Sequence, residues 1–291
     1  MRLILSRKGF DSANGGVPSP ILPDGTLRPL PIPYETGSRA FAELGGPAPR
    51  PAELLADLAR GRRMPWGAPL GARTPAHLDP DLDRRALPRP PDWRPAFGQT
   101  GAAQSHLAAR AVGPGDLFLF FGWFRAAEHA AGRWRYVRGA PSLHVIFGWL
   151  QIGEVLPAHP ALPAPAWLRA HEHFRADLGP SSTVYAAADV LALGGAPVPG
   201  VPAAGVVRTL RDTLVLTAPG APRSEWRVPA CLAPRDGRPA LSYHERPARW
   251  RPDGPDHARV RSAPIGQEFV LECDQEAVAW TRALLAPEAA P

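Results

Sequence analysis

The sequence predicts an α+β fold with a mostly β core, long proline-rich excursions and a few helices. Segments typical of strands outnumber helical patches, and the two do not alternate as they would in a parallel βαβ sheet. The 38 prolines and 28 glycines among 291 residues predict long, stiff connections. Apolar residues make up 45% of the chain, which is ample for a sizeable core and argues against disorder.

Local patterns place the individual elements. Strands are predicted at 2–6, 117–121, 143–150, 151–156, 183–187, 213–217, 225–228 and 267–272. Helices are predicted at 51–60, 101–111 and 275–285, and Pro51 suits the first turn of the first of these. Residues 36–97 are otherwise rich in proline and arginine. We expect them to form a peripheral excursion within a single domain that spans 1–291.

A polar loop follows the first strand. Gly15, Gly16 and Pro18 exclude a helix there, and the loop lacks the Gly-Lys-Ser/Thr ending of a phosphate-binding P-loop. At a strand end beside a glycine turn, charged side chains and backbone N–H groups can converge on one anionic or polar ligand. The loop's candidate site residues are Arg7, Lys8, Asp11, Ser12 and Ser19. The alternative is a solvated turn in which Asp11 caps backbone amides.

A composition bias singles out the same loop. Of the 33 basic residues only one is a lysine, Lys8, and the chain has one asparagine, Asn14. Such a bias suggests that lysine and asparagine persist only where their side-chain chemistry matters. A lysine ammonium is compact and can lose its proton, whereas a guanidinium stays charged. Because Lys8 and Asp11 follow a strand end, we expect incomplete burial and a stability cost under ~1 kcal/mol for replacing either.

Aromatic side chains concentrate in the strand that begins after Gly115. Trp123, Phe124 and Arg125 at its end are typical of a stacking pocket for a flat base, although such aromatics also commonly fill a core. Gln104 and His106, on the helix just before this strand, are candidates for hydrogen bonding to a ligand. We expect the N-terminal loop and the 115–125 strand to line one pocket.

The sequence contains no recognisable metal or hydrolase motif. His171 and His173 are two residues apart, which predicts opposite faces of a strand or the wrong spacing on a helix. No His-Glu-x-x-His motif is present, and Cys231 and Cys273 do not form a metal-binding pair. We therefore expect no metal and no cofactor. The absence of a Gly-x-Ser-x-Gly elbow argues against acyl-transfer hydrolysis.

Charge and hydropathy bear on partners and location. The net charge is +6, with arginines spread along the chain, which permits an anionic partner without proving one. The N-terminal apolar stretch is too short for a signal peptide, and the longest apolar run, 117–124, is too short to span a bilayer. We expect a cytoplasmic protein without a membrane partner.

Several segments together resemble one family. They are LSRKGFDSANGGVPSPILPDGTL, FGQTGAAQSHL, GDLFLFFGWFR, HVIFGWLQIGEV, STVYAAADVL, RSEWRVP and GQEFVLE, and they span nearly the whole chain. The resemblance is to the nucleotide modification associated domain family, third type. It implies a bacterial protein associated with modified nucleotides in DNA. The arrangement of the 115–125 and 143–155 strands is also similar to PUA-like domains of the EVE and ASCH kind, which implies a small β-barrel that holds a modified base.

Three functions remain open at this point. The first is recognition of a modified base or nucleotide, with DNA the favoured nucleic acid: Trp123 and Phe124 would stack on the base, and Arg7 and Arg125 would meet phosphate. Asp11, with His106 or Gln104, would read the base edge. The second is an enzyme acting on a nucleotide or DNA base, with Lys8 and Asp11 as catalytic groups. The third is a partner-binding subunit of a DNA-modification system.

Overall fold

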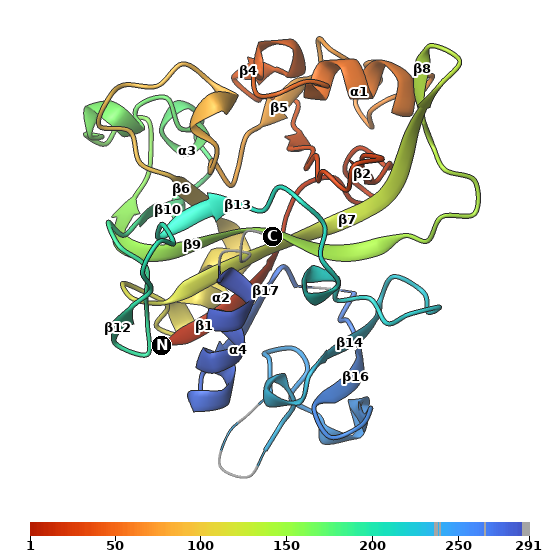
Figure 1. Ribbon diagram of the computed structural model, residues 1–291. Coiled ribbons are helices and arrows are strands. Elements are labelled where there is room, and N and C mark those ends of the chain that lie inside the picture. Colours follow the sequence, from red (N-terminus) through yellow and green to blue (C-terminus); the bar gives the residue numbers. More distant parts are fainter. Residues whose placement is uncertain (236–237, 239, 265, 287–291) are drawn as a thin grey trace.

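The strand β7 (Leu117–Ala130) is the centre of the largest sheet in the computed structural model, which describes residues 1–235, 238, 240–264 and 266–286 (Figure 1). All residues from Leu117 to Gly122 are buried. A strand that is covered on both faces has a continuous apolar sequence rather than an alternating one, which is why this segment can be identified from sequence.

The main sheet has the strand order β17-β1-β7-β9-β10-β6. β1 pairs in parallel with β7, whereas the other neighbouring strands along this order are antiparallel. β2 and β8 also pair with β7, and β13 pairs with β9. The strands besides β7 are β1 (Arg2–Arg7), β2 (Ser19–Ile21), β6 (Ala96–Gln99), β8 (Arg133–Tyr136), β9 (Leu143–Pro157), β10 (Thr183–Ala187), β13 (Ala204–Val206) and β17 (Glu268–Glu272).

The predicted α+β class with a mostly β core is confirmed, but within the described residues the sheet does not close into the expected PUA-like barrel. Its two end strands meet through side chains instead of a backbone ladder. Gln99 on β6 donates from Nε2 to Oε1 of Glu268 on β17, at 2.6 Å. The curl of the sheet also brings Phe97 of β6 against Phe118 and Phe120 of β7, with ring centroids 4.9 and 5.1 Å apart.

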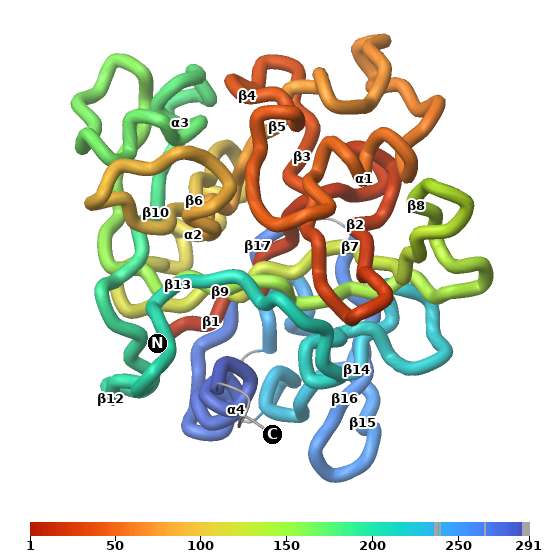
Figure 2. The backbone as a smooth tube through the Cα atoms, turned by 45° about the horizontal axis from the view of Figure 1, so that its top comes forward, coloured from red at the N-terminus to blue at the C-terminus, as the bar shows by residue number. Residues whose placement is uncertain are grey.

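The proline-rich excursion folds around a second apolar core. It contains α1 (Pro51–Leu58), β4 (Arg39–Ala40) and β5 (Pro75–His77), and β5 pairs with β4 and with β3 (Ile32–Pro33), which precedes the excursion, in a small sheet. The second core also takes in Phe10 and Val17 of the N-terminal loop, so the loop is held between the excursion and the sheet. Figure 2 shows the excursion on one side of the main sheet, with α1 beside β8. Ala96 and Phe97, predicted to end the excursion, belong to β6.

Shorter elements complete the fold. On the other side of the main sheet lies a sheet of β14 (Glu225–Pro229), β16 (His257–Arg261) and β15 (Trp250–Pro252) (Figure 2). The remaining strands and α-helices are β11 (Ala192–Leu193), β12 (Ala196–Pro197), α2 (Gly101–Ala109), α3 (Glu172–Arg175) and α4 (Gln275–Leu285). Of the helices in the described part of the chain, none is long and apolar enough to cross a membrane.

Two of the predicted strand assignments differ from the structure. The segments 143–150 and 151–156 form a single strand, β9. The segment predicted as a strand at 213–217 is not a continuous strand: Asp212–Leu214 is a short 3₁₀ helix, and Val215 and Thr217 form isolated antiparallel bridges with Val145 and Trp226. The amides of Leu214 and Val215 bond to the carbonyls of Arg211 and Asp212, so these groups are used within a tight turn and are not free for a strand ladder.

Asp116 fastens the N-terminus to the start of β7. Its carboxylate accepts the Arg2 amide at 2.6 Å and the Gly113 amide at 3.0 Å, and the residue is buried. Asp116→Ala leaves both amides without this acceptor and should lower the free energy of unfolding by about 1–3 kcal/mol. Urea denaturation measures the change. Asp189→Ala, at an exposed position, is the control, and an equally small effect of both substitutions would contradict this assignment.

Candidate functional site

The topology of the sheet creates a loop beside Trp123. β1 and β2 both run parallel to β7 and pair with successive parts of it, with Arg7 opposite Phe121 and Ser19 opposite Phe124. Residues 8–18 therefore leave the sheet next to Gly122 and Trp123. A Cβ on Gly122 would lie 2.8 Å from the carbonyl oxygen of Lys8, so glycine allows the two backbones to approach here.

The loop and Trp123, in the middle of β7, line one pocket, as the sequence predicts. The pocket has a volume of about 460 Å³. Its charged lining residues are four arginines and one aspartate, namely Arg7, Arg223, Arg249, Arg261 and Asp11. Ser12, Trp123 and His144 are among the other lining residues. The pocket is therefore cationic and has an aromatic wall.

Two guanidinium groups define the interior of this arginine pocket. Arg7 donates from Nη2 to the Ala263 carbonyl at 2.9 Å and to Ser262 Oγ at 3.2 Å. Arg223 lies over the Trp123 ring, with Cζ 4.2 Å from the centroid, and donates to Ser12 Oγ at 3.2 Å. Burial lowers the pKa of both arginines from their ordinary value, but a guanidinium stays protonated at neutral pH.

Two neutral groups in the pocket have defined hydrogen-bonding capacity. Among the described residues, the buried indole N–H of Trp123 has no hydrogen-bond partner. Burial, and then the charges of Arg7 and Arg223, hold the pKa of His144 well below its usual range. Its Nδ1 accepts the Trp226 indole N–H at 2.9 Å, so the neutral ring carries its proton on Nε2.

Asp11 shapes the loop. Its Oδ1 accepts the amides of Ala13 and Asn14 at 2.7 and 2.6 Å, and the Asn14 side-chain amide donates to both carboxylate oxygens at 3.1 Å. The amide-capping alternative is thus confirmed, although Asp11 also lines the pocket. Asn14, the single asparagine, has a structural reason to persist, because its backbone and side-chain amides donate to the Asp11 carboxylate and fix this turn.

Lys8 is placed differently from the prediction. It is buried, with 6% of its side chain exposed, and its Nζ lies 2.7 Å from Oε1 of the fully buried Glu268. It also lies 4.6 Å from the centroid of the Phe97 ring. The expectation of incomplete burial is therefore wrong. Lys8 forms an interior ion pair, and Asp11 caps amides of the loop. The structure therefore does not support the pairing of Lys8 with Asp11 that the enzymatic alternative requires.

The other predicted site residues contact the scaffold. Ser19 is buried and accepts the Leu30 amide at 3.0 Å, and Gln104 accepts the Tyr185 hydroxyl at 2.9 Å. His106 lies 2.9 Å from Ser242 Oγ. Phe124 is fully buried, which leaves no face for a base, and Arg125 donates to the Val137 carbonyl at 3.1 Å. Arg7, Asp11, Ser12 and Trp123 are thus the predicted residues that the fold brings together at the pocket.

The sequence analysis missed Arg223, Arg249 and Arg261, because nothing in their local pattern distinguishes them from the many other arginines.

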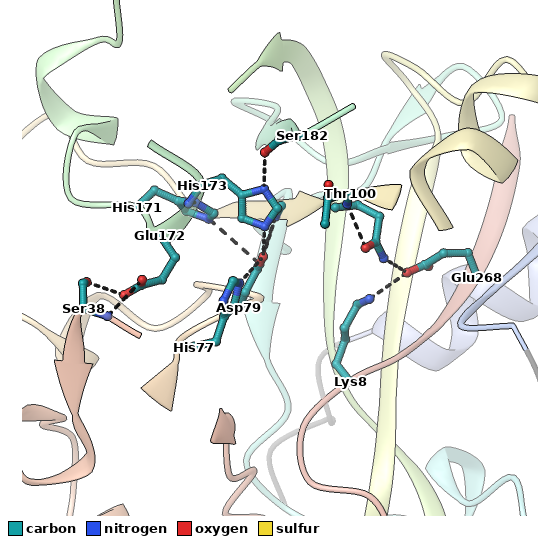
Figure 3. A network of polar contacts seen from close by, with 12 residues as sticks. Lys8, Ser38, His77, Asp79, Thr100, His171, Glu172, His173, Ser182 and Glu268 are labelled. Atoms are coloured by element: carbon teal, nitrogen blue, oxygen red, sulfur yellow. Dashed lines mark hydrogen bonds and ion pairs between the residues drawn. The ribbon is translucent and has the colours of Figure 1, made fainter. Parts of the chain in front are cut away.

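It also missed a cluster of histidines around Asp79, shown in Figure 3. Nε2 of His77 and Nε2 of His173 lie 3.4 and 3.2 Å from Oδ2 of Asp79. His171 Nε2 lies 3.9 Å from Oδ1 of the same carboxylate.

The spacing argument for His171 and His173 is wrong, because the two residues do not lie within one regular element. His171 precedes α3 with extended backbone, and His173 lies in its first turn. This change of conformation lets both rings approach Asp79, as Figure 3 shows. A pair at His-x-Asp spacing, such as His77 and Asp79 at the end of β5, is the sequence signal that could have indicated the cluster.

Fold and pocket together define an α+β protein with a cationic, aromatic-walled pocket at the end of its N-terminal strand. The chain belongs to the nucleotide modification associated domain 3 family, whose model matches residues 2–272. The match spans the pocket loop, the excursion and every strand of the main sheet. It links the protein to nucleotide modification. No match was found among curated proteins or among solved structures.

The buried ion pair gives a stability prediction for Lys8. Lys8→Met leaves the Glu268 carboxylate buried without its cation and should cost about 3–5 kcal/mol of unfolding free energy. The double variant Lys8→Met/Glu268→Gln should lose less than the sum of the two single changes. Chemical denaturation measures all three. Arg39→Ala, which breaks a solvent-exposed ion pair with Glu43, is the control. Equal costs for Lys8→Met and Arg39→Ala would show that the Lys8 charge is not desolvated.

Proposed function

We propose that the arginine pocket binds a nucleotide, free or in DNA, and that the protein is a recognition module for a modified base. The main support is that four arginines, one aspartate and Trp123 line one pocket in a chain whose family is associated with nucleotide modification. Guanidinium groups form forked hydrogen bonds with phosphate oxygens, and an indole ring offers a stacking surface to a base.

The geometry gives each pocket residue a distinct role. Arg7 and Arg223 come from different elements, β1 and the segment before β14, and both are partly buried. They are the proposed phosphate ligands. Arg249 donates from both Nη1 and Nη2 to backbone carbonyls, whereas the bonds of Arg7 to Ser262 and Ala263 come from Nη2, so the contribution of Arg249 is mainly its charge. A base would stack on Trp123 in competition with the Arg223 guanidinium that now covers the ring.

The neutral groups are suited to reading a base. The Trp123 indole N–H has no partner in the described chain, and the proton on His144 Nε2 provides a second N–H. Two neutral donors suit the carbonyl oxygens or ring nitrogens of a base edge better than they suit a cation. Ser12 Oγ accepts a hydrogen bond from Arg223 and so connects the loop to one of the two proposed phosphate ligands.

The two alternative functions have less support. The enzymatic alternative depends on Lys8, which is buried against Glu268. A partner-binding surface would need a contiguous exposed apolar patch. In the described chain only three large apolar side chains are exposed, those of Val155, Leu162 and Val190.

A binding assay tests the proposal. Purified protein is titrated with plain and base-modified deoxynucleotides and short single-stranded DNA, followed by tryptophan fluorescence and calorimetry. We expect binding that weakens as salt rises, because arginines replace counterions at the phosphates. Arg7→Ala and Arg223→Ala should each weaken binding by about 10-fold or more. Trp123→Leu should weaken it by about 5- to 100-fold through lost stacking.

Arg73→Ala is the matched control, since Arg73 is an exposed arginine that does not line the pocket. It removes the same charge and should leave affinity almost unchanged. Failure of the whole panel to bind at low salt would contradict the proposal. So would equal losses of affinity from Arg73→Ala and Arg223→Ala, since binding would then depend on net charge alone.

A further inference from the structure

We propose that His77, Asp79 and His173 bind a divalent transition metal ion, zinc or iron(II), at the junction of the excursion with the main sheet. One donor atom from each of these residues lies within 4.8 Å of the others. The three are largely or fully buried, with 14%, 4% and 3% of their side chains exposed. They come from the end of β5 and from α3, which are far apart in the sequence (Figure 3).

The distances suit metal ligands at least as well as they suit hydrogen bonds. A good N–H···O hydrogen bond has a donor–acceptor distance of about 2.9–3.0 Å. The two imidazole Nε2 atoms lie 3.4 and 3.2 Å from the same carboxylate oxygen, Asp79 Oδ2. Two ligand atoms that are each ~2.1 Å from a zinc ion lie roughly 3.4 Å apart at the tetrahedral angle. Two of the three donor–donor separations therefore already match a zinc site, and the third, between the two imidazole nitrogens, is within 4.8 Å.

Outer hydrogen bonds hold the donors in this orientation. Nδ1 of His173 lies 2.8 Å from Ser182 Oγ, and a proton donated there leaves Nε2 free as a ligand. The Gly98 amide donates to both oxygens of Asp79, at 2.9 and 3.0 Å. Metal sites commonly have such partners, since a hydrogen bond on the distal nitrogen fixes the tautomer and orientation of a ligating histidine.

His171 contributes a different interaction. Its Nδ1 accepts the His173 amide at 3.4 Å, so a neutral His171 ring carries its proton on Nε2, which faces Asp79 at 3.9 Å. Within the described chain this buried Nε2 makes no hydrogen bond. Because the N–H of this neutral ring faces the Asp79 carboxylate, no lone pair of His171 is free for an ion, and we assign His171 to the electrostatic surroundings of Asp79 rather than to the ligand set. Three protein ligands leave further coordination positions for water or another molecule.

The donor set selects the class of ion. Two imidazoles and one carboxylate suit zinc or iron(II), whereas magnesium and calcium prefer oxygen ligands alone. The ion would bind the excursion to α3, a junction already held by Ser38, whose hydroxyl donates to the buried Glu172 at 2.5 Å. Gly98 lies so close to His173 that a Cβ at residue 98 would be 2.3 Å from the imidazole ring.

Metal titration of the full chain tests the inference. Protein freed of metal with a chelator is titrated with Zn²⁺, with Fe²⁺ under anaerobic conditions, and with Mg²⁺. One equivalent of Zn²⁺ or Fe²⁺ should bind, and Mg²⁺ should not compete. Asp79→Asn and His173→Gln should weaken binding by more than about 100-fold, and Gly98→Ala by about 10- to 100-fold through displacement of the His173 ring. His159→Gln removes a more exposed imidazole and is the control.

A second readout does not depend on how the variants fold. Co²⁺ bound to the wild-type chain should give intense visible bands and paramagnetically shifted imidazole N–H signals from two histidines. The inference fails if the wild-type chain binds none of these transition metals, or if the Co²⁺ spectrum is that of the hydrated ion. It also fails if folded Asp79→Asn and His173→Gln bind the metal as tightly as His159→Gln does.

Discussion

The buried contact among Lys8, Glu268 and Gln99 is the constraint on which the fold depends most. It joins the end of β1 to both end strands of the main sheet, because Glu268 Oε1 receives Lys8 Nζ at 2.7 Å and Gln99 Nε2 at 2.6 Å. A carboxylate in the interior is costly unless it is paired, so this one fixes three strands relative to one another. The sheet can therefore remain open as a backbone ladder while its edges are held together.

The position of the arginine pocket follows from the same strand. Side chains along an extended chain alternate in direction, so consecutive residues at the end of β1 have different environments. Lys8 enters the interior, while Arg7 reaches Ser262 and Ala263 at the pocket. The loop that follows is confined between β1 and β2, which pair with successive parts of β7, and it can only lie beside Trp123.

β6 connects the interior ion pair with the histidine cluster. Gly98 donates its amide to Asp79, and its neighbour Gln99 donates its side-chain amide to Glu268. Two adjacent residues of one short strand thus hold a carboxylate from the excursion and a carboxylate from β17. A displacement of β6 would change the hydrogen bonds to both Asp79 and Glu268, which couples the junction of the excursion to the packing of the sheet.

The sequence by itself determined the α+β class, most of the strands and helices, and the contact between the N-terminal loop and the strand that carries Trp123. These follow from local hydrophobic pattern and turn chemistry, which act over a few residues. The single lysine and the single asparagine directed attention to this loop, and its functional role stays a prediction. Their roles were decided by tertiary structure, because Lys8 depends on Glu268, about 260 positions later, whose presence beside it no local pattern reveals.

Only the tertiary structure decided which other residues make up the arginine pocket and the histidine cluster around Asp79. Arg223, Arg249 and Arg261 look like any other arginine in the sequence, and the fold alone brings them to the pocket. His77 and Asp79 meet His173 beside β6, where Gly98 donates its amide to Asp79 and leaves room for the His173 ring, so imidazoles from distant segments lie near one carboxylate oxygen. The physical reason is the same in both cases: charged and metal-binding side chains act through distances in space, and spacing along the chain encodes those distances only within a single helix, strand or turn.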